Sequence, residues 1–118
     1  MPNALPPVEE IKQFLLRVRV ELTKPGRFEL IPRSANLKCL ADLGLTVAAA
    51  ISEIMSLTYH DYYQGPSPDD NTAKPGDVWV FVKRIDGIYV YIKLKLDADR
   101  GCVCLSFHEP LHPFVHPY

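Results

Sequence analysis

The sequence predicts an α+β fold in which helices come first and a C-terminal antiparallel sheet follows. Apolar residues recur at three- and four-residue spacings through the first half of the chain, which is typical of amphipathic helices. From residue 88 onward apolar and polar residues alternate, as they do in β-strands with one buried face. The pair Asp86-Gly87, which favours tight hairpins, separates two of the predicted strands. We therefore expect a meander with helices packed on one side.

The first helix is expected over residues 7–22. Its apolar residues share one helical face: Ile11, Phe14, Leu15, Val18 and Leu22. Pro25-Gly26 ends this helix, and residues 27–31 are interpreted as a short strand.

Two further helices are expected before the sheet. Ser34 is a suitable N-cap for residues 35–43, and Gly44 suits the end of that helix. Thr46 is a suitable cap for residues 47–57. Thr58 and Asp61 have the spacing of a cap for one more turn. The residues expected to point inward from these two helices are Leu37, Leu40, Leu43, Val47, Ala50, Ile51, Ile54 and Met55.

A long loop is expected over residues 64–76, which are rich in proline and glycine. Strands follow over 77–85, 88–96 and 102–108, and the first of these is apolar on both faces, as in an interior strand. The predicted core face of the other two comprises Ile88, Val90, Ile92, Leu94, Leu96, Val103, Leu105 and Phe107.

The composition bounds the class of protein. With 118 residues, 47% hydrophobic and 23% charged, we expect one globular domain over 1–118, with its core over 26–109. The N-terminus has no signal-peptide pattern and no apolar run is long enough to span a membrane, so we expect a cytoplasmic protein without a membrane partner. The 3 cysteines are expected to be reduced thiols. The tail over 110–118 is expected to be exposed or loosely docked, and its histidines as metal ligands are the less favoured interpretation.

Polar side chains gather on the second face of the predicted sheet. Alternation places Tyr91, Lys93 and Lys95 together on one strand. Because Ile92, Leu94, Leu105 and Phe107 are assigned to the core, Tyr91, Lys93, Ser106 and His108 should share the opposite face. RNA cleavage through its own 2′-hydroxyl needs a base, an acid and cations, and His, Tyr and Lys supply such groups.

A plainer interpretation of the same face stays open. A Tyr-Lys-Lys-His set is also typical of a solvated sheet surface, and His108 could be a structural residue at a strand end. The net charge of −1 argues against a protein that binds nucleic acid by bulk charge, so any RNA site must be a local patch.

Several short strings, in this order, are similar to those of the MqsR family of bacterial toxins, within the wider RelE-like group of mRNA interferases. They are ArgSer at 33–34, LeuGlyLeu at 43–45, AspTyrTyr at 61–63, GlyAspValTrp at 76–79, TyrIleLys at 91–93 and SerPheHis at 106–108. The resemblance implies a RelE-like fold and a toxin of a type II toxin–antitoxin pair. Such a protein cuts messenger RNA and is neutralised by a cognate antitoxin protein.

The resemblance also implies site residues. The catalytic tyrosine of the family falls on Tyr91, and its C-terminal basic residue falls on His108. A family lysine falls on Gln64 and a family glutamine falls on Val80, so these positions are altered. We therefore expect His108 as general acid or base with Tyr91 as its partner. Charge stabilisation is assigned to Lys93 and Arg84.

RNA binding is assigned to Tyr63, Gln64, Lys83 and Lys95. Lys83 and Arg84 should point to opposite faces. Lys83 would serve the site only if Trp79 and Phe81 lined the RNA groove, and these two are expected in the core, as are Tyr59 and Tyr62 at the end of a helix.

The expected reaction needs no cofactor and no metal, because the candidate face carries no Asp/Glu cluster. One alternative is a non-catalytic regulator that binds RNA or protein on the same fold. Another is a structural interaction domain. The sequence leaves open the need for the ribosome, the base preference and the role of the tail.

Overall fold

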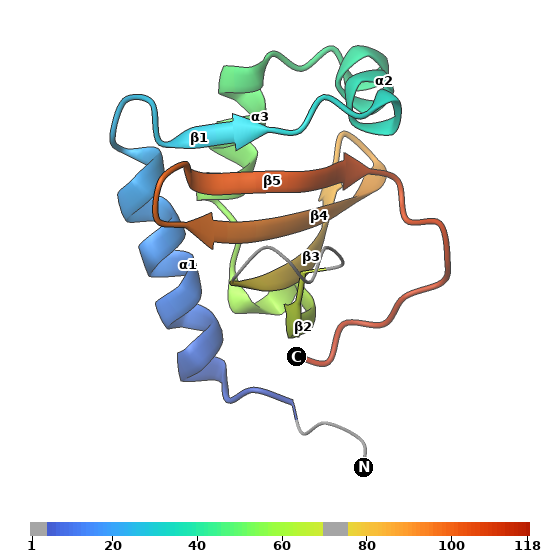
Figure 1. Ribbon diagram of the computed structural model, residues 1–118. Helices are drawn as coiled ribbons and strands as arrows, with labels where there is room; N and C mark the ends of the chain where they lie inside the picture. The colour runs from blue at the N-terminus through green and yellow to red at the C-terminus, as the bar shows by residue number, and fades with distance from the viewer. Residues whose placement is uncertain (1–4, 70–75) are drawn as a thin grey trace.

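The computed structural model describes residues 5–69 and 76–118 (Figure 1). Its strands form one sheet in the order β1-β5-β4-β3-β2. The α+β fold is confirmed, with the helices mostly before the sheet along the chain. The elements are α1 (Val8–Leu22), β1 (Phe28–Leu30), α2 (Ser34–Leu43), α3 (Val47–Met55), the 3₁₀ turn η1 (Tyr59–Asp61), β2 (Tyr62–Pro68), β3 (Asp77–Ile85), β4 (Ile88–Asp97) and β5 (Gly101–His108).

The core lies between the helices and one face of the sheet. The ring of Phe14 on α1 stacks on Trp79 of β3, with centroids 4.6 Å apart, and lies 6.1 Å from Phe81. Tyr62 meets both of these rings edge-on and is 2% exposed. The expected core positions of Trp79, Phe81 and Tyr62 are therefore confirmed. No helix in the described ranges is both long and apolar enough to cross a membrane.

Local signals set most of the helix ends. The hydroxyl of Thr46 accepts a hydrogen bond from the backbone N–H of Ala49 at the start of α3. Thr58 and Asp61 form the predicted capping box. Gly44 ends α2 with φ +68°, a conformation that glycine adopts without strain. The helix α2 begins one residue earlier than predicted, at Ser34.

Two of the residues predicted to point inward do not. Leu37 and Val47 are 48% and 49% exposed, whereas Leu40, Ala50 and Ile54 are buried as expected. In the first turn of α2 it is Asn36, the neighbour of Leu37, that is buried and faces β5. The prediction of a helix was correct in both cases, and the prediction of burial was wrong for Leu37 and Val47.

The short predicted strand is confirmed as β1, but it pairs with β5 in parallel, while the other neighbouring strands are antiparallel. Gly101 at the start of β5 lies against the backbone of Arg27, just before β1. A Cβ atom there would come within 2.2 Å of the carbonyl oxygen of Arg27, so the close approach requires glycine.

The predicted loop over 64–76 is wrong for its first residues. These belong to β2, an edge strand that pairs antiparallel with β3 through an irregular register. Proline is tolerated at a sheet edge because the N–H that it lacks would face away from the neighbouring strand. Part of the predicted loop, 70–75, lies outside the described residues.

A β-bulge in β5 changes which side chains reach the core. The register shifts between Lys93 and Leu94, so that Leu94 lies opposite Cys104 and Lys95 opposite Val103. Cys102 and Cys104 therefore join the core cluster together with Phe107. The prediction that Val103 and Leu105 share the core face with Phe107 is wrong, because the extra residue in the bulge reverses the alternation.

The prediction of an exposed or loosely docked tail is largely confirmed, since Leu111 and Val115 are 82% and 79% exposed, but a few of the tail residues dock on the sheet. The tail leaves β5 and passes along the side of the sheet toward β2, where the chain ends (Figure 1). The ring of Phe114 contacts Tyr89 of β4 and Tyr63 of β2, at centroid distances of 5.0 and 6.2 Å. His116 Nε2 donates a hydrogen bond of 2.8 Å to the carbonyl oxygen of Val82, beyond the point where β2 stops pairing with β3.

Candidate active site

The face of the sheet opposite α1 carries two adjacent rows of residues that cross the strands. In one row, Val82, Tyr91 and His108 are register partners on β3, β4 and β5. In the other, the partners are Gln64, Val80, Lys93 and Ser106, from β2 to β5. The predicted grouping of Tyr91, Lys93, Ser106 and His108 on one face is confirmed, because the bulge comes only after this part of β5.

Tyr91 and His108 form the centre of this face. Their rings stack with centroids 5.5 Å apart and an angle of 13° between the planes. His108 Nδ1 lies 2.8 Å from the carbonyl oxygen of Glu109, which can only accept a hydrogen bond. Nδ1 therefore carries the proton, and Nε2 of the neutral ring has a free lone pair. A histidine held in this tautomer is suited to accept a proton at Nε2.

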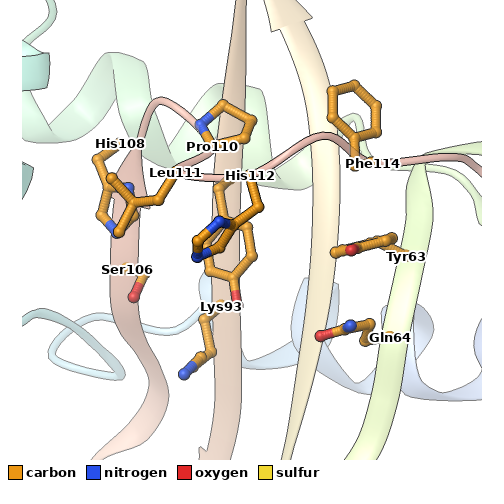
Figure 2. Close-up of a pocket in the computed structure, with 10 residues that line it drawn as sticks. Tyr63, Gln64, Lys93, Ser106, His108, Pro110, Leu111, His112 and Phe114 are labelled. Carbon is orange, nitrogen blue, oxygen red and sulfur yellow. The ribbon is translucent and has the colours of Figure 1, made fainter.

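A cavity of about 270 Å³ lies beside this stacked pair (Figure 2). Lys93 supplies a cation to its wall, and Ser106, which is 4% exposed, supplies a hydroxyl. Tyr63 and Gln64 line the side formed by β2. The volume is near the lower end for small-molecule pockets. The cavity therefore combines an imidazole, a phenol, an ammonium group and a further aromatic ring.

Three of the predicted site residues, Arg84, Lys95 and Lys83, do not line the cavity. Arg84 is on the same face, two residues beyond Val82, and its guanidinium lies 5.9 Å from the ring of Tyr89. Lys95 is on the same face too, but it is 4% exposed and its Nζ is 2.8 Å from Asp69 Oδ2.

Lys83 points to the helix side of the sheet. Its Nζ is 3.1 Å from Glu53 Oε1 on α3 and also donates to the hydroxyl of Ser56, which follows the last residue of that helix. The prediction that Lys83 and Arg84 point to opposite faces of the sheet is confirmed. Lys83 was expected to serve the site only if Trp79 and Phe81 lined the RNA groove, and both of these residues lie in the core.

The comparison with protein families identifies the chain. A family model described as "Motility quorum-sensing regulator, toxin of MqsA" matches residues 13–109. The chain belongs to the MqsR toxin family. Membership in the MqsR toxin family implies a toxin of a toxin–antitoxin system. No curated protein matches the chain.

The match to the MqsR toxin family stops at Glu109, and the tail that follows forms the outer wall of the cavity. Pro110, Leu111, His112 and Phe114 of the tail line it together with the residues of the sheet (Figure 2). Sequence reasoning did not assign the tail to the site. The sequence did contain one signal for the tail: Val80 and Val82 make the second face of β3 apolar, so another segment must cover that face. In the structure these two valines are 4% and 0% exposed.

The thiols and carboxylates offer no second site within the ranges 5–69 and 76–118. No group of three or more His, Cys, Asp or Glu side chains gathers there in a way that could hold a metal ion. The three cysteines are free and buried. Burial raises the pKa of the Cys102 thiol to about 12 and raises the pKa of Cys104 further, so both are neutral thiols at physiological pH.

Proposed function

We propose that this chain is an mRNA endoribonuclease that acts as a toxin and is neutralised by a cognate antitoxin protein. The observation that carries the proposal is the stacked pair Tyr91–His108 beside Lys93 in a cavity, in a chain of the MqsR toxin family. The bacterial cytoplasm is the compartment where such a protein meets messenger RNA.

His108 is the general base in this proposal. Its Nε2 takes the proton from the 2′-hydroxyl of the substrate, and the carbonyl of Glu109 at Nδ1 stabilises the imidazolium that forms. Tyr91 is its partner, because ring stacking fixes the plane of the imidazole and the phenol can donate a hydrogen bond to a phosphate oxygen. Both residues come from adjacent strands in register, which keeps the pair rigid.

Lys93 stabilises the charge that develops on the phosphate. The 2′-oxygen forms a bond to phosphorus, the bond from phosphorus to the 5′-oxygen breaks, and a proton must reach that oxygen. The products are a 2′,3′-cyclic phosphate and a 5′-hydroxyl, and the bond changes balance without a metal ion. Arg84, on the same face but outside the cavity, is placed to meet the RNA backbone further along its path.

Base recognition is assigned to the β2 side. Tyr63 is half-buried, and its ring offers a stacking surface for an unpaired base. Gln64 is exposed, and its amide can donate and accept hydrogen bonds at a base edge. Lys95 is buried and its charge is compensated by Asp69, so the proposal gives it no direct contact with RNA.

The test expresses the full chain alone in a bacterium, beside His108→Ala and a matched control, His60→Ala. The ring of His60 lies 4.0 Å from that of Tyr59, and His60 is not among the residues that line the cavity. Growth arrest with new transcripts that start with a 5′-hydroxyl, in wild type and His60→Ala only, is the expected result. Arrest in all three would remove His108 from the mechanism, and normal growth in all three would favour the non-catalytic regulator.

Metal independence is tested with purified protein and an RNA oligonucleotide. Cutting at the same rate with and without EDTA is expected. Loss of cutting in EDTA that magnesium restores would contradict this part of the proposal.

A further inference from the structure

Among the described residues that line the cavity, His112 is the titratable group that the proposed mechanism leaves without a role. It comes from the tail, which lies beyond the residues matched by the family model. Figure 2 shows its ring in front of β4, between His108 on one side and Tyr63 on the other. The ring therefore faces the place where the scissile phosphate would sit beside His108 and Lys93.

The tail is anchored on both sides of His112, so the backbone that carries this side chain is held beside the cavity. On the N-terminal side it follows His108, whose ring is fixed by the stack with Tyr91. On the C-terminal side Phe114 packs on Tyr89, and His116 donates to the carbonyl of Val82. The last residue, Tyr118, donates its hydroxyl hydrogen to the carbonyl of Pro6 beside α1.

The imidazole of His112 itself makes no hydrogen bond or ion pair with any described residue, which contrasts with its neighbours. His108 and His116 each use one ring nitrogen on a backbone carbonyl. His112 is exposed on the solvent side of the cavity wall, so both of its nitrogens are available to a ligand. A role in docking the tail, which His116 performs, does not explain it.

The chemistry of the proposed reaction needs such a group. His108 can take the proton from the 2′-hydroxyl, but the 5′-oxygen leaves as a strongly basic alkoxide unless an acid protonates it. A phenol loses its proton near pH 10, whereas histidine is the side chain suited to donate a proton near neutrality. Gln64 and Val80, in the row next to Tyr91, cannot act as acids at all.

We propose that His112 is the general acid of the site and donates its proton to the leaving 5′-oxygen, while His108 removes the proton of the 2′-hydroxyl. This inference rests on the proposed ribonuclease function. The tail would then complete the site that the matched part of the chain leaves short of a proton donor.

The test compares two RNA substrates that differ at the scissile bond. One has the natural 5′-oxygen, and the other has sulfur in that position, which leaves as a stable thiolate and needs no acid. His112→Ala is expected to cut the natural substrate about 100-fold or more slowly than wild type, and to cut the sulfur substrate at the wild-type rate. His108→Ala should be slow on both substrates, and His60→Ala should match wild type on both.

The alternatives give different results in the same experiment. If the tail only covers the site, His112→Ala or removal of residues 110–118 will speed up cutting, and the inference is overturned. Unchanged cutting of the natural substrate by His112→Ala would overturn it too, while the proposed ribonuclease function would stand. Failure of the wild-type chain to cut RNA would overturn both proposals, which separates that outcome from the others.

Discussion

Asn36 of α2 accepts a hydrogen bond from the backbone N–H of Phe107, 2.9 Å away, directly beside the candidate catalytic residue His108. The same side chain donates to the carbonyl oxygens of Ile31 and Leu105, at 2.9 and 3.1 Å. Asn36 is completely buried. One amide thus satisfies three backbone groups around the bulge in β5, and it joins α2 to the strand that carries the site.

Replacing Asn36 with Ala should destabilise the fold by about 3 kcal/mol, because buried backbone groups would lose their partners. Urea unfolding at equilibrium measures the change. Lys38→Ala, on the exposed part of the same helix, should leave the stability almost unchanged, since its ion pair with Asp42 is on the surface. Equal stability of Asn36→Ala and wild type would show that the bulge does not depend on this amide.

The stacked pair can be separated into ring and hydroxyl. Tyr91→Phe keeps the ring that packs on His108 and removes the hydrogen bond to phosphate, so cutting of an RNA oligonucleotide should slow about 10- to 100-fold. Tyr91→Ala removes both and should be slower still. Single-turnover rates, measured on variants that are shown to be folded, check this order. A wild-type rate in Tyr91→Phe would limit Tyr91 to holding the imidazole.

Two lysines on opposite faces of the sheet provide a matched comparison. Lys93 lines the cavity, whereas Lys83 forms an ion pair with Glu53 of α3 and a hydrogen bond with Ser56 at the end of that helix. Lys93→Ala should lower the cutting rate by about 100-fold, because the charge on the phosphate would lose its cation. Lys83→Ala should cost about 1 kcal/mol of stability and leave the rate per folded molecule unchanged. Rates corrected by the folded fraction at the assay temperature distinguish the two, and equal losses of rate would contradict the assignment of faces.

The helix ends and the hairpin turn could be predicted from the sequence. Thr46, Gly44 and Asp86-Gly87 act through their own backbone neighbourhood, so their effects could be read without the rest of the chain. The bulge in β5 could not be read, because Cys102, Val103, Cys104 and Leu105 are all apolar enough for either face. The contacts that fit the bulge come from far away along the chain: Asn36, which bonds to the carbonyl of Leu105, is 69 residues from it.

The site was predicted on the sheet and missed on the tail for a related reason. Alternation is a property of one strand, so it placed Tyr91, Lys93 and His108 together. The tail has no period, and its proline residues exclude a helix or an interior strand without deciding whether it docks. Its position depends on contacts with β2, β3 and β4, such as that between Phe114 and Tyr89.

The buried cysteines lead to a prediction about thiol chemistry and pH. Burial raises the pKa of Cys102 from 9.0 to about 12, so below pH 9 its thiolate is about a thousandfold scarcer than in the unfolded chain. Cys102 and Cys104 are 0% exposed, whereas Cys39 is 8% exposed. Iodoacetamide with mass spectrometry should therefore label Cys39 first in the native protein, and all three at similar rates in urea. Native labelling of Cys102 as fast as Cys39 would contradict the buried position.

The same raised pKa makes stability fall at alkaline pH. Above pH 9 the unfolded chain releases the Cys102 proton while the native protein keeps it, so the free energy of unfolding falls as the pH rises toward about 12. The stability is therefore unaffected by the ionisation of this thiol below pH 9 and decreases progressively above it. Urea midpoints at pH 7.5 and pH 10.5 measure the loss in wild type and in Cys102→Ala. The alanine variant should start lower, because a small cavity forms, but should lose less between the two pH values. Equal losses in the two proteins would show that Cys102 does not contribute to the alkaline sensitivity.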